Sequence, residues 1–294
     1  ASNGNGPAYF ARSINGGISW EAAKSIYNPG GSGQTIGNLV TVIPDGTLIN
    51  LFTKIVNIGG IDIATLAVIR SGNQGATWSQ PFHISDLLAV GTRDPETGTL
   101  IRDGSILAQI ATGPDGKLYV VWQDSRFSGG LIDGIAFSQS TDGGLTWSNP
   151  IQINSDHNVQ AMIPTVHVRP DGVIGVAYYD LRSNTSDPAT LLTDYWLATS
   201  EDGLNWSESR ITKPFDYTTA PFAGGYFIGD YQSLVSSNNV FIPFFVKTNS
   251  GNFVNRTDVF AAPAVFKVTG KSYIPGSATP KRSASMGRRV HENI

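Results

Sequence analysis

The chain twice pairs an aspartate with an arginine two positions later, an arrangement suited to acid–base chemistry or to recognition of a charged group. The pairs are Asp124 with Arg126 and Asp180 with Arg182, and each follows an apolar, aromatic run typical of a strand. Such residues either pair with each other or present both charges to a polar ligand. Because the arrangement recurs, we expect a structural salt bridge first. The alternative is ligand binding by Arg126, Arg182 and the adjacent Tyr179.

A long loop over residues 85–104 collects charges in a chain that otherwise has few. Arg93, Arg102 and Asp103 belong to it, and it is the longest insertion between the repeated units described below. Loops longer than about 12–15 residues inside a compact domain are usually functional. We expect Arg102 and Asp103 to contribute to a site because they adjoin the following strand, and Arg93 to bind the same ligand.

A third candidate segment, residues 224–234, combines flanking glycines with aromatic and acidic side chains. Tyr226, Asp230 and Tyr231 lie in it, just before a strand, and are candidate contacts to a ligand. Neighbouring side chains of a regular strand point to opposite sides, although Gly229 allows a local bend. We predict that Tyr231 faces the pocket and that Asp230 orients a neighbouring loop. The alternative is a core-lining Tyr231 with its hydroxyl hydrogen-bonded.

A repeated polar turn that ends in tryptophan must position these candidates. The turns begin at Ser13, Ser71, Ser140 and Ser200; the third reads Ser-Thr-Asp-Gly-Gly-Leu-Thr-Trp, and the fourth is one residue shorter. We call them the octet turns. Asp142 is expected to accept backbone N–H groups, the glycines to supply positive φ, and each tryptophan to pack at a blade edge. Recurrence at intervals of roughly 60 residues, with short strands between, predicts the four-stranded blades of a β-propeller.

A second repeat, Pro-Asp-Gly, precedes three of the octet turns. It occurs at residues 44–46, 114–116 and 170–172, where proline presets φ and glycine takes the position that needs φ > 0. A blade therefore reads: inner strand, Pro-Asp-Gly turn, second strand, loop, third strand, octet turn, outer strand. In antiparallel blades both kinds of turn lie on one face of the ring, the turn face. The remaining loops, with the candidate residues, lie on the opposite face, the loop face.

These units give five visible blades. Residues 38–84, 105–153 and 163–212 are complete copies. Residues 8–27 supply only two strands, and residues 231–268 form a last unit without an octet turn. We therefore predict an all-β fold, a β-propeller of four-stranded antiparallel blades.

The octet pattern Ser-x-Asp-x-Gly-x-Thr-Trp resembles the Asp-box, or BNR repeat, of sialidases and related propellers. The resemblance covers residues 9–266 and implies a sialidase-like β-propeller, a family that generally has six blades. Tyr231 and the Gln-Ser-Leu after it resemble the segment in which sialidases carry their nucleophilic tyrosine. The family's Arg-Ile-Pro motif is absent. Glu201 and Glu208 flank an octet turn on the turn face, so no glutamate is predicted to activate Tyr231.

The scaffold implies an exo-acting glycoside hydrolase on an acidic or polar glycan or glycoconjugate. A tyrosine nucleophile suits a reacting carbon beside a carboxylate, because a neutral phenol avoids charge repulsion. If Tyr231 is not the nucleophile, a carboxylate pair drawn from Asp103, Asp124 and Asp180 is the next candidate. The competing hypothesis is a non-catalytic propeller that binds carbohydrate or protein through the same residues; lyase or esterase chemistry is a third.

The composition argues against several kinds of partner and cofactor. The 294 residues carry a net charge of −3, which implies no nucleic-acid partner, and the 4 histidines show no metal-ligand spacing. There is no cysteine for a disulfide or thiolate site, no cofactor is expected, and no apolar run is long enough to span a membrane. We expect one propeller domain over residues 1–269, a basic tail over residues 270–294, and a secreted or periplasmic protein. The sequence does not indicate an oligomeric state.

Overall fold

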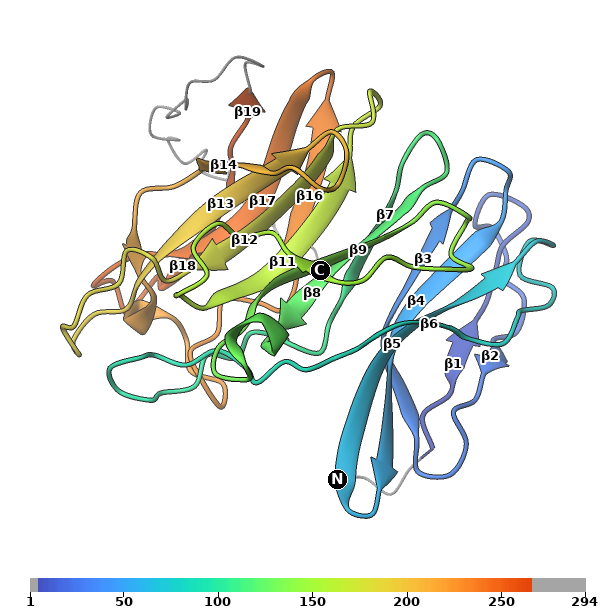
Figure 1. Ribbon diagram of the computed structural model, residues 1–294, viewed down its shortest axis with the longest axis horizontal. Helices are drawn as coiled ribbons and strands as arrows, with labels where there is room; N and C mark the ends of the chain where they lie inside the picture. Colours follow the sequence, from blue (N-terminus) through green and yellow to red (C-terminus); the bar gives the residue numbers. More distant parts are fainter. Residues whose placement is uncertain (1–4, 266–294) are drawn as a thin grey trace, which may run out of the picture.

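The computed structural model describes residues 5–265, which form five antiparallel sheets with almost no helix (Figure 1). The predicted all-β class and its four-stranded antiparallel blades are confirmed. Consecutive strands pair with each other along each sheet, as expected for propeller blades. In Figure 1 the two-stranded sheet of β1 and β2 lies on one side, and the fourth and fifth sheets, which overlap in this view, lie on the other.

Each sheet is built from one continuous stretch of the chain. The first two sheets contain β1 (Ala8–Phe10) and β2 (Lys24–Tyr27), then β3 (Gln34–Val42), β4 (Leu48–Ile58), β5 (Ile61–Ser71) and β6 (Phe82–Asp86). The third contains β7 (Gln109–Thr112), β8 (Leu118–Asp124), β9 (Gly134–Ser140) and β10 (Ile151–Gln152). The fourth contains β11 (Ala161–Val168), β12 (Ile174–Asp180), β13 (Leu192–Ser200) and β14 (Ser207–Arg210), with β15 (Phe215–Asp216) beside β13. The fifth contains β16 (Ser233–Ser237), β17 (Val240–Thr248) and β18 (Thr257–Ala261), with β19 (Ala264–Val265) beside β17.

Apolar side chains on both faces of the second strands hold neighbouring sheets together. β8 and β12 are buried along their whole length because each has a sheet on either side. Leu51 and Trp122 belong to the cluster between the second and third sheets, and Phe137 and Tyr178 to the next. Full burial of a large apolar side chain contributes about 1.5–3 kcal/mol. These interfaces therefore fix the blades, and with them the loops at both ends.

The octet turns have the predicted hydrogen bonds. Asp142 accepts the backbone N–H groups of Leu145 (3.1 Å) and Thr146 (2.9 Å), and its other oxygen accepts the Thr146 hydroxyl (2.6 Å). Gly143 and Gly144 have φ of 71° and 88°, where side chains are disfavoured. The Asp142 carboxylate is thus bonded by groups of its own turn.

The tryptophans of later octet turns pack on the sheet before them. The Trp78 ring lies 5.4 Å from Phe10 of β1, and the Trp206 ring lies 5.0 Å from Phe137 of β9, both edge to face. Trp20 is 66 % exposed. Within the described residues no sheet precedes β1, so the first tryptophan has no surface to pack on, unlike the later ones.

Replacing Asp142 by asparagine is expected to be nearly neutral near pH 7 and to change the response to acid. Desolvation raises the pKa of Asp142, but hydrogen bonds from Thr146, Ser140 and Leu145 outweigh it and lower the pKa from 3.8 to about 2. The stabilising effect of this carboxylate is therefore present above pH 4 and is lost as the pH falls towards 2. Asn73, in the equivalent place, makes the corresponding bonds without titrating.

Urea unfolding of the wild type and Asp142→Asn between neutral and strongly acidic pH measures this difference. The two unfolding free energies should match near neutrality, and the variant should lose less stability in acid. Profiles that stay parallel would show that the Asp142 carboxylate is not linked to folding. Asp142→Ala, which removes the acceptor altogether, should cost about 1–2 kcal/mol at neutral pH, as loss of a cap does.

The predicted basic tail over residues 270–294 lies outside the described residues, as do the last residues of the predicted domain over 1–269. Among residues 5–265, no helix has the length and apolar character needed to cross a bilayer.

Candidate functional site

The long loop and the glycine-flanked segment, far apart in sequence, are joined by main-chain hydrogen bonds. The Arg102 N–H donates to the Tyr226 carbonyl (2.9 Å), and the Tyr226 N–H donates to the Leu100 carbonyl (2.8 Å). Gly225 permits this approach, because a Cβ there would lie 2.6 Å from the Leu100 carbonyl oxygen. Two of the three sequence-predicted segments therefore form one unit.

Arg102 stands at the centre of this unit. Its guanidinium bonds to the Asp230 carboxylate (3.3 Å) and lies 4.3 Å from the centre of the Phe227 ring. The Arg102 side chain is 50 % exposed, whereas Asp230 is largely covered. We call Arg102, Tyr226, Phe227 and Asp230 the loop-face cluster. The other N–H groups of the Arg102 guanidinium remain available to an acceptor from solvent, because the ion pair with Asp230 occupies only one edge of the guanidinium.

Tyr231 follows Asp230 directly and is 63 % exposed. It precedes β16, and Gly229, two residues earlier, has φ of 116°, so the chain bends where the cluster meets the strand. The exposed Phe222 ring packs edge to face on Tyr226, 6.2 Å away. Tyr231 and Phe222 thus give the cluster an accessible aromatic surface. Tyr226 is less exposed than Tyr231. Burial raises the pKa of the Tyr226 hydroxyl, and the nearby Asp94 and Asp216 carboxylates raise it by smaller amounts.

Asp103 lies beneath the cluster and is only 5 % exposed. Its carboxylate accepts the Thr92 N–H (2.7 Å), the Ser105 N–H (3.0 Å) and the Gln123 amide (2.8 Å). These bonds join the end of the long loop to Thr92 in its middle and to Gln123 of β8. The Asp103 carboxylate therefore has a structural role in holding the loop.

Gln123 and Asp133 complete this support. Asp133 accepts the N–H groups of Val90 and Gly91 (both 2.9 Å), and Gln123 donates to both carboxylates while accepting the Ile163 N–H (2.9 Å). Burial raises the pKa of Asp133, and the neighbouring Asp103 raises it further, against these hydrogen bonds. The sequence has an aspartate near the start of each third strand, at Asp62, Asp133, Asp194 and Asp258, and its recurrence favours a loop cap over catalysis. Asp133 binds the long loop in this way, whereas no sequence pattern singles out a role for Gln123.

Arg93 is held by its backbone, with its side chain exposed. The Gln160 amide accepts the Arg93 N–H (2.9 Å) and donates to the Arg93 carbonyl (2.7 Å). The Arg93 guanidinium makes one long bond to the Gly98 carbonyl (3.4 Å). Arg93 thus projects from the same loop as Arg102 without joining the loop-face cluster.

Asp124 and Arg126 pair with each other. Asp124 is fully buried and receives two hydrogen bonds from the Arg126 guanidinium, both 2.8 Å, as well as the Trp122 indole N–H (2.7 Å). Arg126 also donates to Ser85, at the end of β6 (2.8 Å). The pair links β8 to the preceding blade. Asp124 and Arg126 thus form a structural salt bridge, the role expected first for this motif.

Asp180 and Arg182 pair in the same way, with a second carboxylate. The Arg182 guanidinium bonds to Asp180 (2.5 Å) and Glu208 (2.9 Å) and stacks 3.7 Å from the Trp196 ring. Burial raises the pKa of Asp180 to about 6, although Arg182 opposes this. Burial also raises the pKa of Glu208, but hydrogen bonds from Arg182, Ser155 and Tyr178 outweigh it and lower that pKa.

The predicted position of the Glu208 side chain is wrong. The sequence predicts it beside an octet turn on the turn face, but in the structure it reaches Arg182 and the Tyr178 hydroxyl inside the blade. Tyr179, a predicted ligand contact, is fully buried. Its hydroxyl donates to the Val246 carbonyl (2.8 Å) and accepts the Val246 N–H (2.9 Å). A side chain in that position packs between the fourth and fifth blades, and we leave it out of the proposed site.

The structure thus places the predicted residues apart from one another: the loop-face cluster, the Asp124–Arg126 pair and the Asp180–Arg182 pair are separate. Within residues 5–265, no hydrogen bond or ion pair joins the loop-face cluster to either Asp–Arg pair. In the same part of the chain, no three His, Cys, Asp or Glu side chains are arranged to hold a metal ion. The accessible groups of the cluster and of the neighbouring Tyr231 and Phe222 are a guanidinium, a phenol and aromatic rings. These groups suit hydrogen bonding to, and stacking on, a polar ligand.

Residues 8–221 match the model of the BNR repeat-like domain. The chain belongs to this family. No curated protein sequence matches the chain.

Solved structures with a similar fold are only distantly related in sequence. A protein of unknown function from Dyadobacter fermentans DSM 18053 is 14 % identical, with a TM-score of 0.53 over 90 % of this chain and 73 % of that one. Penicillium chrysogenum α-L-arabinanase, complexed with arabinobiose, is 15 % identical, with a TM-score of 0.51 over 87 % and 86 %. Phage phi92 endosialidase is 12 % identical, with a TM-score of 0.51 over 90 % of this chain but 42 % of its own. These likenesses establish the propeller fold of this BNR-family chain.

Proposed function

We propose that this BNR-family propeller is an exo-acting glycoside hydrolase whose substrate, a polar or acidic glycan, binds at the loop-face cluster. The observation that carries the proposal is the half-exposed Arg102 guanidinium, held by Asp230 and Phe227, together with the exposed Tyr231 that follows Asp230 in the chain. Arginine recognises carboxylates and hydroxyl oxygens, and aromatic rings accept the apolar face of a sugar. The arabinanase and the endosialidase, which share the fold, act on glycans by their names.

Tyr231 is the nucleophile in this proposal. Of the four candidates Tyr231, Asp103, Asp124 and Asp180, the tyrosine alone is accessible, since the three carboxylates are at most 5 % exposed. The Tyr231 oxygen would bond to the anomeric carbon as the bond to the leaving oxygen breaks, and the proton that Tyr231 loses would pass to that leaving oxygen. On its way this proton needs an acceptor, and the adjacent carboxylate is that of Asp230. Water would then attack the anomeric carbon, break its bond to Tyr231 and return a proton to the tyrosine. Arg102 would hold the substrate's acidic or hydroxyl group beside the reacting carbon.

Non-catalytic glycan binding is the second candidate, and burial of the three carboxylates favours it. Asp103, Asp124 and Asp180 are each engaged by protein donors, so none offers an accessible acid or base. In this case Arg102, Tyr231 and Phe222 would contact a sugar without turnover.

A panel of aryl glycosides distinguishes the two candidates, because an aryl leaving group departs without a general acid. The panel contains α-L-arabinofuranosides, β-galactosides and a sialic acid derivative. Release of the aryl group by the purified protein, lost in Arg102→Met, supports hydrolysis at this site. Binding on a glycan array that depends on Arg102, with no release from any glycoside, supports the non-catalytic candidate instead.

A further inference from the structure

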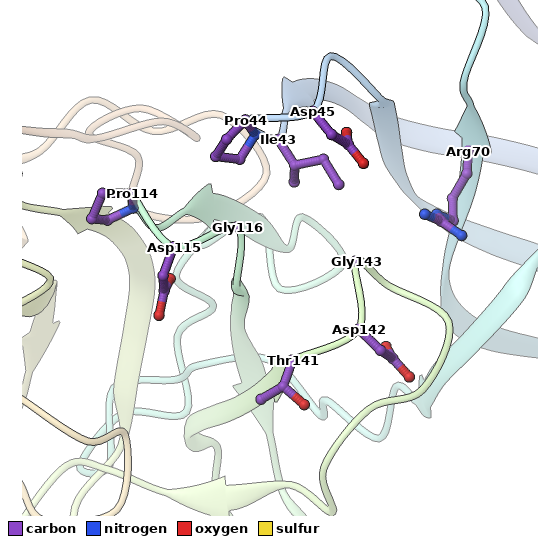
Figure 2. A pocket seen from close by; sticks show the side chains of 10 residues that line it. All are labelled: Ile43, Pro44, Asp45, Arg70, Pro114, Asp115, Gly116, Thr141, Asp142 and Gly143. Atoms are coloured by element: carbon purple, nitrogen blue, oxygen red, sulfur yellow. The ribbon is translucent and has the colours of Figure 1, made fainter.

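A pocket of about 340 Å³ opens on the turn face, opposite the loop-face cluster (Figure 2). The Pro-Asp-Gly turns of the second and third blades form two of its walls, and the octet turn at residues 140–147 forms a third. Arg70, from the end of β5, completes it. The volume lies at the lower end of the roughly 300–1,000 Å³ usual for small-ligand sites. The proposed hydrolase site uses none of these residues.

Arg70 presents an unused guanidinium to this pocket. Its Nε atom is buried without a hydrogen-bond partner, and within residues 5–265 no ion pair or hydrogen bond involves the guanidinium. An unsatisfied buried donor is costly and rare in folded proteins. A Cβ at Gly143 would lie 3.2 Å from the Arg70 Nη2 atom, so the glycine gives the guanidinium its place against the octet turn. Among residues 5–265 the Arg70 guanidinium therefore has no protein acceptor.

All three carboxylates around the pocket accept hydrogen bonds, but Asp142 and Asp115 use both of their oxygens and Asp45 only one. Asp142 receives the hydrogen bonds of its own turn, and Asp115 forms an ion pair with Lys117 (2.7 Å). Asp45 accepts the Thr47 N–H (2.8 Å) and, in Figure 2, points with Arg70 into the space between the turns. The available polar groups are thus one cation and one anion, flanked by the apolar surfaces of Ile43, Pro44 and Pro114.

The next pair of blades lacks these features. Gln139 precedes its octet turn as Arg70 does, and a Cβ at Gly203 would lie 2.7 Å from the Gln139 Oε1 atom, so an uncharged amide fills the corresponding place. Asp171, the counterpart of Asp45 and Asp115, is bound by Arg169, whose Nε atom lies 3.0 Å away. Among these blades of the described chain, the unpaired guanidinium beside the octet turn is therefore a property of the second and third blades and not of the repeat.

We propose that the turn-face pocket is a second, non-catalytic site that binds one neutral sugar residue. Sugar hydroxyls can accept from the Arg70 guanidinium and donate to the Asp45 carboxylate, while the C–H face of the ring packs on Pro44 and Pro114. Because the free cation and anion balance each other, an uncharged ligand matches the pocket better than an anion or a cation. This site does not depend on hydrolysis at the loop face.

Titration of the full chain with neutral methyl glycosides, followed by NMR of the arginine Nε–H signals, tests this proposal. Methyl α-L-arabinofuranoside and methyl β-D-galactopyranoside are the probes, with inorganic phosphate and N-acetylneuraminic acid as charged comparators. At least one neutral glycoside should shift the Arg70 signal, and the charged compounds should shift it less. Arg70→Met should weaken that glycoside's binding at least about tenfold, in line with losing hydrogen bonds to a charged group.

Gln139→Ala is the matched control, because it alters the equivalent position of the next blades, and it should bind as the wild type does. If Arg70→Met does not fold, Asp45→Asn takes its place and should also weaken binding. Release of aryl groups at the loop face should be unchanged in all these variants. A failure of the turn-face binding proposal can therefore be told apart from a failure of the loop-face hydrolysis proposal. Phosphate as the tightest ligand, or glycoside binding unaffected by both substitutions, would overturn the proposal, as would no shift of Arg70 by either glycoside at millimolar concentrations.

Discussion

Tyr231→Phe is expected to lower kcat/KM for the hydrolysed aryl glycoside at least about a hundredfold while leaving the fold intact. The substitution removes only the hydroxyl, the atom proposed to bond to the anomeric carbon, and a lost catalytic group has effects of this size. Tyr231 is exposed, so stability should change by less than about 0.5 kcal/mol. Initial rates and thermal unfolding of the wild type and the variant measure both quantities.

Tyr9→Phe is the control for this comparison. Tyr9 lies in β1 and is 64 % exposed, against 63 % for Tyr231, so the two substitutions remove equally accessible hydroxyls. Tyr9→Phe should hydrolyse at the wild-type rate. A folded Tyr231→Phe variant with near-normal turnover would exclude the tyrosine as nucleophile.

Arg182→Met is expected to cause the largest loss of stability, about 3–5 kcal/mol, which is typical when one member of a buried ion pair is removed. The substitution leaves the Asp180 and Glu208 carboxylates in the blade without their common cation. Methionine keeps an apolar stem against Trp196, so the loss reports chiefly on charge. The loss should be smaller in mildly acidic buffer, where the two carboxylates can take up protons.

Arg102→Met provides the comparison for stability. Its ion pair with Asp230 is half exposed, and such surface pairs contribute about 0–1 kcal/mol. Denaturant unfolding of the two variants should therefore differ by several kcal/mol at neutral pH. Equal and small losses would mean that the Arg182 bridge contributes little to the fold.

The fold could be predicted because its information is local and repeated. An octet turn such as that around Asp142 satisfies its own hydrogen bonds, so the same few residues produce the same turn in each blade. The Pro-Asp-Gly turns act likewise, and together they fixed the order of strands. Trp20 shows the limit of this reasoning, because packing on a neighbouring sheet depends on whether that sheet is there.

The candidate site could be predicted only in part, because it depends on contacts between distant segments. The sequence singled out Arg102 and Asp230, but not that they would meet across the loop face. Gln123, which links Asp103 to Asp133, lies in an apolar strand where no pattern marks it. The turn-face pocket was missed because its distinguishing residue, Arg70, lies beside a repeat rather than within it.

Covalent trapping tests the central claim, that Tyr231 is the nucleophile of a glycoside hydrolase, most directly. The probe is a fluorinated glycosyl fluoride of the sugar that the protein hydrolyses, which forms a slowly hydrolysed glycosyl–enzyme with loss of fluoride. Peptide mass spectrometry should find one fluoroglycosyl group on Tyr231 and none in Tyr231→Phe. A label on Asp103, Asp124 or Asp180 instead, or no label on a protein that turns over its substrate, would contradict the account.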